Sequence, residues 1–135
     1  MQIENSNNPL IERILTEACD NAKKKFHSLS DISADPIVKG MMRKLFSTYG
    51  LDATKERPSG EALIRRIVDG KGLYRINSFV DLNNAISISS GCPCGVYDIS
   101  KIKGDIEFII GTTGQTYEGI LGNQLNAETT TTHQG

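Results

Sequence analysis

Apolar residues along the first two thirds of the chain recur every three or four positions, the spacing that places them on one face of a helix. Two helices are predicted to begin at the same signal, an Asn or Asp followed by proline, at Asn8-Pro9 and Asp35-Pro36. Ser59 and Ser78 are the predicted caps of two more helices. The predicted helices run over about 9–27, from 36 to Gly50, from 59 to Gly70, and from 78 to an ambiguous end near Ile86-Ser87-Ile88-Ser89.

Beyond Gly91 the pattern changes to that of β-strands. Ile106–Ile110 and Thr116–Leu121 are separated by the glycine-containing segment Gly111–Gln115, which predicts a hairpin. Helices followed by strands indicate the α+β class. The segment 123–135 contains four consecutive threonines and almost no apolar residue, so we expect a disordered tail after a single domain over 1–122.

Length and composition narrow the class of protein. A chain of 135 residues with a net charge of −1 has the size of one small domain. Its longest uninterrupted apolar runs are three residues, far short of the roughly 20 that a membrane span needs. The first dozen residues lack the basic end and apolar stretch of a secretory signal, and three cysteines do not suit a disulfide framework. We therefore expect a cytoplasmic protein without a membrane partner.

The charge is distributed unevenly along the chain. Residues 1–36 carry −2, residues 37–79 carry +5 and residues 80–135 carry −4. The basic side chains of the middle segment are Lys39, Arg43, Lys44, Lys55, Arg57, Arg65, Arg66, Lys71 and Arg75. Such a segment is typical of proteins that bind the phosphate backbone of nucleic acids. Lysine and arginine on the solvated faces of helices are also ordinary, and this interpretation stays open.

Other motifs give little support for catalysis or metal binding. Cys92-Pro93-Cys94 lacks further ligands at a spacing that suits zinc, so small, buried thiols are the better interpretation, and we expect no metal and no cofactor. Gly70-Lys71-Gly72 and Gly111-Thr112-Thr113-Gly114 do not have the pattern of a phosphate-binding loop. A set of polar residues either fastens the neighbouring loops or forms the wall of a pocket: Asp81, Asn83, Asn84 and Asp98.

An ordered series of motifs carries a family resemblance over roughly residues 35–122. The motifs are Arg57-Pro58-Ser59-Gly60-Glu61-Ala62-Leu63-Ile64-Arg65-Arg66, then 70–87, Gly91-Cys92-Pro93-Cys94-Gly95-Val96-Tyr97-Asp98, 101–106 and Gln115-Thr116-Tyr117-Glu118-Gly119. The chain resembles stand-alone relatives of the tRNA-binding and editing domain of the phenylalanyl-tRNA synthetase beta subunit. The resemblance implies an α+β fold in which N-terminal helices pack on a small, mainly antiparallel sheet.

The resemblance also implies a function, with departures at the catalytic positions. In the synthetase this domain hydrolyses the ester of wrongly attached amino acid, chiefly tyrosine, at the 3′ end of tRNA. The pocket histidine of the synthetase falls here on Gly95, and Arg75 lies one residue out of register with the pocket arginine. The segments that carry the pocket glutamate and threonine would follow residue 122, where this chain has Asn123–Gly135. We therefore expect a shortened domain without competent editing.

The leading hypothesis is a protein that binds tRNA or another RNA. The residues expected to contact phosphate are Arg57, Arg65, Arg66, Lys71 and Arg75. The residues expected to line or support the former pocket are Asn77, Asp81, Asn84, Gly95, Tyr97 and Asp98. Two alternatives stay open. One is a hydrolase that edits mischarged tRNA in trans and uses Asp81 or Asp98 to orient the water, and the other is a module that binds an amino-acid-like ligand or a protein without any nucleic acid. Catalytic residues and oligomeric state are left unassigned.

Overall fold

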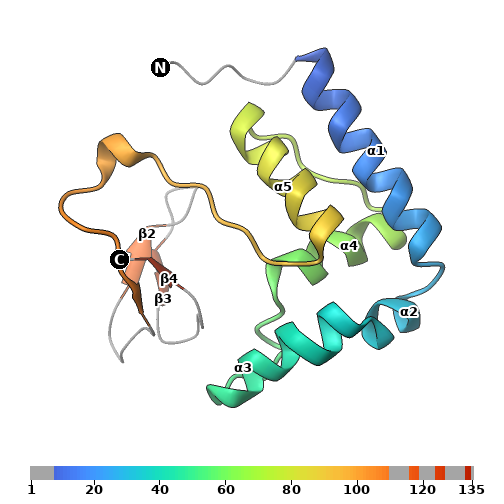
Figure 1. Cartoon of the computed structure of the whole chain (residues 1–135), viewed down its shortest axis with the longest axis horizontal. Coiled ribbons are helices and arrows are strands. Elements are labelled where there is room, and N and C mark those ends of the chain that lie inside the picture. Colours follow the sequence, from blue (N-terminus) through green and yellow to red (C-terminus); the bar gives the residue numbers. More distant parts are fainter. Residues whose placement is uncertain (1–7, 110–115, 119–123, 127–132, 135) are drawn as a thin grey trace. The chain divides into compact units, whose positions relative to one another are not determined.

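A computed structural model describes residues 8–109, 116–118, 124–126 and 133–134 (Figure 1). The chain divides into two compact units. The first, which we call the helical unit, comprises the described residues up to Lys44 together with 57–96. The second comprises 45–56 and the described residues from Tyr97 onward. No helix among the described residues combines the length and the apolar character that crossing a membrane requires.

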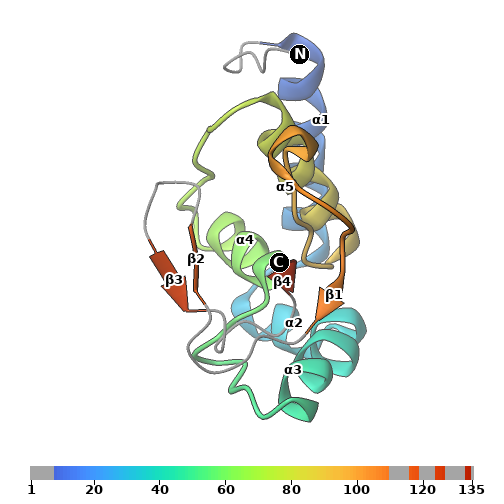
Figure 2. The same ribbon diagram turned by 90° about the vertical axis from the view of Figure 1, so that its left-hand side faces the viewer.

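The helical unit is built from helices packed on one another. Its elements are α1 (Pro9–Lys25), α2 (Leu29–Ala34), η1 (Pro36–Arg43), α4 (Ser59–Val68) and α5 (Ser78–Ser90). Figures 1 and 2 show α5 lying beside α1, and α4 packs against both. The core residues are Leu15, Ala18, Ala22, Phe26, Ile32, Val38, Ile64, Ile67, Ala85 and Ile88. Burial of these apolar side chains, spaced as the sequence indicates, is what holds the unit together.

The helix starts follow the capping chemistry of the sequence with two exceptions. Asn8 accepts a hydrogen bond from the amide of Leu10, and Asp35 accepts from the amides of Ile37 and Val38, so both predicted proline starts are confirmed. Asn77, and not Ser78, caps α5. Pro58 occupies the cap position of α4 and no side chain caps that helix, so the predicted caps Ser59 and Ser78 are instead the first helical residues.

The end of α5 resolves the ambiguity at Ile86-Ser87-Ile88-Ser89. The helix continues to Ser90 and ends at Gly91, whose φ of 76° lies in the left-handed region that favours glycine. The alternation of apolar residue and serine is therefore helical. Ser87 is buried, and its hydroxyl donates to the carbonyl of Cys92 over 2.5 Å. This hydrogen bond satisfies the buried hydroxyl and fastens the loop that follows the helix.

The second unit contains short elements. They are α3 (Lys44–Thr48), whose first residue still belongs to the helical unit, η2 (Ile99–Lys101), β1 (Phe108–Ile109), β2 (Thr116–Glu118), β3 (Gln124–Asn126) and β4 (His133–Gln134). The strands form two antiparallel pairs, β1 with β4 and β2 with β3. The hairpin expected to join 106–110 to 116–121 is therefore wrong in its pairing, and its turn, 111–115, lies outside the described residues.

The predicted α+β fold, with N-terminal helices packed on a small antiparallel sheet, is wrong. The strand pairs of the described residues are only two and three residues long, and two-stranded pairs of this length offer no apolar face on which helices could pack. The helical unit instead builds its core from helices alone. The disordered tail stays a prediction, and its residues 123, 127–132 and 135 lie outside the described residues.

Candidate nucleic-acid interface

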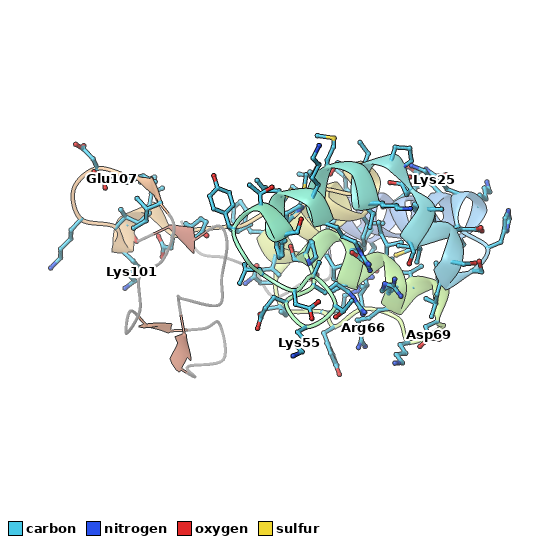
Figure 3. The ribbon with its side chains drawn as sticks, turned by 90° about the horizontal axis from the view of Figure 1, so that it is seen from below. Lys25, Lys55, Arg66, Asp69, Lys101 and Glu107 are labelled. Atoms are coloured by element: carbon cyan, nitrogen blue, oxygen red, sulfur yellow. The ribbon has the colours of Figure 1, made fainter. Side chains whose placement is uncertain are left out.

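Basic side chains from the two ends of α4 surround a shallow concavity of the helical unit. It has a volume of about 270 Å³, and we call it the basic concavity. Its lining residues are Leu29, Arg57, Ala62, Arg65, Arg66, Asp69 and Lys71. Figure 3 shows Arg66 and Asp69 along one side of α4. The four cations outnumber the single lining carboxylate, so the concavity favours an anionic ligand.

A buried carboxylate organises one wall of the concavity. Glu61 lies in the first turn of α4 and is fully buried. Arg43 donates to both of its oxygens, over 3.1 Å from Nε and 2.5 Å from Nη2, and Arg65 donates from Nε over 2.9 Å. The Nε of Arg57 lies 3.7 Å from Oε1 of the same carboxylate. Three guanidinium groups therefore meet at one negative charge, and we call this set the Glu61 cluster.

The carboxylate of Glu61 is ionised at neutral pH. Burial by itself would raise the pKa of Glu61, but the hydrogen bonds and charges of Arg43 and Arg65 outweigh burial and hold that pKa below its ordinary value. The hydrogen bond to Glu61 in turn raises the pKa of Arg43. Arg65 also donates to the hydroxyl of Ser33 over 2.8 Å. Arg65 is thus held on two sides, whereas the contact of Arg57 with Glu61 is long and its side chain is more than a third exposed.

The opposite part of the concavity carries an arginine stacked on a tyrosine. The Nε of Arg66 donates to the carbonyl of Gly72 over 3.1 Å. Its guanidinium carbon lies 4.7 Å from the ring centroid of Tyr74, a cation–π distance. Lys71 pairs with Asp69 over 3.1 Å, and both side chains are largely exposed. An exposed pair of this kind is weak, so the ammonium group of Lys71 is free to exchange its partner for a phosphate.

Arg75, the fifth residue expected to contact phosphate, is not among the residues that line the concavity. Its Nη2 donates to Glu12 of α1 over 2.6 Å, and its Nη1 lies 3.7 Å from Oδ2 of Asp81 in α5. Arg75 therefore connects two helices that pack on each other.

The residues expected to form a pocket have several local roles. Asn77 caps α5, and Asp81 is fully buried with Oδ1 accepting from the amide of Ile76 over 3.3 Å. Asn84 is half-buried on α5, and Gly95 is exposed. Tyr97 and Asp98 belong to the second unit, where Asp98 accepts from the amide and hydroxyl of Ser100. The structure therefore describes Asn77, Asp81, Asn84 and Gly95 in one unit and Tyr97 and Asp98 in the other.

A family model described as the B3/4 domain matches residues 41–132. This chain belongs to the B3/4 domain family. The family resemblance predicted from the motifs is thereby confirmed.

Relatives of this B3/4 chain include beta subunits of phenylalanine–tRNA ligase. The protein from Bartonella henselae is 38% identical over 101 residues, which is 75% of this chain and 12% of the relative. That from Rickettsia conorii is 35% identical over 80 residues, 59% of this chain and 10% of the relative. The chain thus spans about a tenth of the length of these relatives. No solved structure matches the chain.

The cysteines of the B3/4 chain are free thiols, each partly buried. Burial raises the pKa of Cys19, which keeps this thiol in its less nucleophilic, protonated form. Within the part of the chain that the structure describes, no group of three or more His, Cys, Asp or Glu side chains is arranged to hold a metal ion.

Sequence reasoning missed two residues of the site. The sequence pattern marks Glu61 only as part of a motif, although it lies four positions after Arg57 and four before Arg65. That spacing brings side chains together on a helix and was the available signal. Tyr74 was treated only as part of a motif. Its position beside Arg66 depends on the turn at 70–72, and no periodic pattern marks that contact.

Proposed function

We propose that this chain binds RNA, with tRNA as the first candidate, in the cytoplasm. The observation that carries the proposal is the gathering of Arg57, Arg65, Arg66 and Lys71 around one concavity. Cations that neutralise phosphates release bound counterions, and this release drives nucleic-acid binding. The B3/4 relationship and the tRNA ligase beta subunits among the relatives support tRNA over other polyanions.

The four cations contribute differently in this proposal. Arg65 is bound to Glu61 and Ser33, so its main part is to hold the wall of the concavity. Arg66 and Lys71 are the better phosphate ligands, because their protein contacts are a backbone carbonyl, an aromatic ring and one exposed ion pair. A test of binding therefore has to change Arg66 and Lys71 and leave the Glu61 cluster intact.

The variant Arg66→Gln with Lys71→Gln is expected to bind tRNA about tenfold more weakly at low salt. The plot of log affinity against log salt should also become less steep by about 1.5, because each lost phosphate contact lowers the slope by roughly 0.7 to 0.9. Fluorescence anisotropy of labelled tRNA over a salt series measures both quantities.

The matched control is Lys23→Gln with Lys24→Gln, which removes the same charge from exposed residues of α1 that do not line the concavity. The control should keep the wild-type slope. An equal loss in both variants would show that only net charge matters. Stabilisation of the fold by free phenylalanine or tyrosine and not by tRNA would favour the amino-acid-binding alternative.

We further propose that the chain does not edit mischarged tRNA. Gly95, which stands where the resemblance places the pocket histidine of the synthetase, supplies no side chain for acid–base chemistry. Oδ1 of the fully buried Asp81 accepts from the amide of Ile76 and its Oδ2 lies 3.7 Å from Nη1 of Arg75, and Asp98 is bound to Ser100.

Purified protein is expected to leave the hydrolysis of tyrosyl-tRNA at its spontaneous rate, measured by the release of labelled tyrosine. The Asp81→Asn variant should give the same rate as wild type. Hydrolysis above the spontaneous rate that this variant abolishes would instead establish editing in trans.

A further inference from the structure

Tyr74 presents an aromatic ring at the side of the basic concavity. It is 74% exposed, so most of the residue is accessible to a ligand. The guanidinium of Arg66 lies against the ring at 4.7 Å from the centroid. Because most of the residue stays exposed beside this guanidinium, a second planar group can reach the tyrosine.

Arg66 joins this ring to the concavity. The same side chain lines the concavity, stacks on Tyr74 and is fixed by its hydrogen bond to the carbonyl of Gly72. Neither the tyrosine nor the arginine therefore has to be ordered from a free state when a ligand arrives, which lowers the entropic cost of binding. A phosphate held by Arg66 and Lys71 would place the attached nucleotide next to the ring.

We propose that Tyr74, supported by Arg66, is a stacking platform for an unpaired nucleobase, so that the basic concavity prefers single-stranded RNA to a duplex. This inference rests on the proposed RNA-binding function and names its substrate class. Every base has an aromatic face, so stacking tolerates different sequences. A base within a duplex is already stacked between its neighbours and reaches such a ring only after it is splayed out.

The test compares Tyr74→Leu and Tyr74→Phe in the full chain. The probes are a labelled, unstructured RNA of about ten nucleotides, an RNA duplex of the same length, and inorganic polyphosphate. Leucine keeps apolar volume but removes the aromatic face, so Tyr74→Leu should bind the single strand about five- to hundredfold more weakly. Tyr74→Phe should stay within about twofold of wild type, because the ring is retained.

The salt dependence of binding and the affinities for duplex and polyphosphate separate stacking from electrostatic attraction. Tyr74→Leu should keep the wild-type salt slope and the wild-type affinity for duplex and polyphosphate, since it removes no cation. Tyr49→Leu is the matched control, because Tyr49 is also exposed but belongs to the second unit, and it should bind like wild type. Equal melting temperatures of these variants would show that each remains folded.

The outcomes distinguish the two proposals. Salt-dependent binding of single-stranded RNA that Tyr74→Leu leaves unchanged would overturn the stacking platform and keep the proposed function. Equal losses on single strand, duplex and polyphosphate would also overturn it, because such losses follow from a displaced Arg66. Absence of salt-dependent RNA binding by the wild-type chain would overturn both.

Discussion

Replacement of Glu61 by glutamine is expected to lower the free energy of unfolding by about 3 kcal/mol, because it leaves the guanidinium groups of Arg43 and Arg65 without a counter-charge in a largely buried site. Glutamine keeps the shape and one acceptor oxygen, so the loss reports the charge and not a cavity. Urea unfolding followed by far-UV circular dichroism measures it.

A double-mutant cycle assigns the loss to the cluster. Arg43→Gln alone should also destabilise the fold, because the carboxylate of Glu61 is fully buried. The variant with both Glu61→Gln and Arg43→Gln should lose clearly less than the sum of the two single variants, since neither then leaves the other unpaired. Glu17→Gln, an exposed carboxylate of α1, is the matched control and should change stability by less than about 0.5 kcal/mol.

The pH dependence of stability gives an independent readout of the same group. The pKa of Glu61 is lower in the folded chain than its ordinary value of 4.5, so ionised Glu61 adds stability above the ordinary value. That stability is lost as the pH falls through the lower, folded pKa. The wild-type chain should therefore destabilise more steeply than Glu61→Gln below about pH 4.5. Parallel curves, or additive losses in the cycle, would show that the cluster is not coupled.

Local signals in the sequence predicted the helices of this chain more accurately than they predicted how its strands pair. The starts at Asn8 and Asp35 depend on a cap and a proline in adjacent positions, so a single stretch of sequence contains the whole cause. Strand pairing joins distant segments. β1 (Phe108–Ile109) pairs with β4 (His133–Gln134), and β4 lies in the segment 123–135, whose polar composition gave no strand signal.

The candidate site was also predicted only in part. Charge counting found the basic segment, and four of its five predicted phosphate ligands line one concavity. Counting charges could not show which cations have partners inside the protein. Arg65 and Arg75 carry the same charge as Arg66, yet Arg65 pairs with Glu61 one turn earlier on α4 and Arg75 pairs with Glu12 of α1. The Glu61–Arg65 pair could be predicted from its spacing of four residues, whereas the Arg75–Glu12 pair depends on how the helices pack.

The second large loss of stability is expected on substitution of Gly60, where the start of α4 approaches the backbone that follows α5. A Cβ added at Gly60 would lie 2.9 Å from the carbonyl oxygen of Gly91 and 3.0 Å from the carbonyl of Cys92. Backbone atoms cannot rotate away as a side chain can, so α4 or the loop has to shift. Gly60→Ala should therefore destabilise the fold by about 2 kcal/mol, although alanine favours helices by roughly 1 kcal/mol over glycine.

Gly40→Ala in η1 is the matched control for this close approach. A Cβ at Gly40 meets nothing within 4 Å, so only the helix propensity of alanine remains, and the variant should be as stable as wild type or up to about 1 kcal/mol more stable. Urea unfolding of both variants gives the comparison, and equal effects would contradict a tight contact at Gly60.

Because Gly60 directly precedes Glu61, a shift of α4 also moves the carboxylate that Arg43 and Arg65 share. Gly60→Ala should consequently flatten the acid limb of the stability curve as Glu61→Gln does, whereas Gly40→Ala should leave it unchanged.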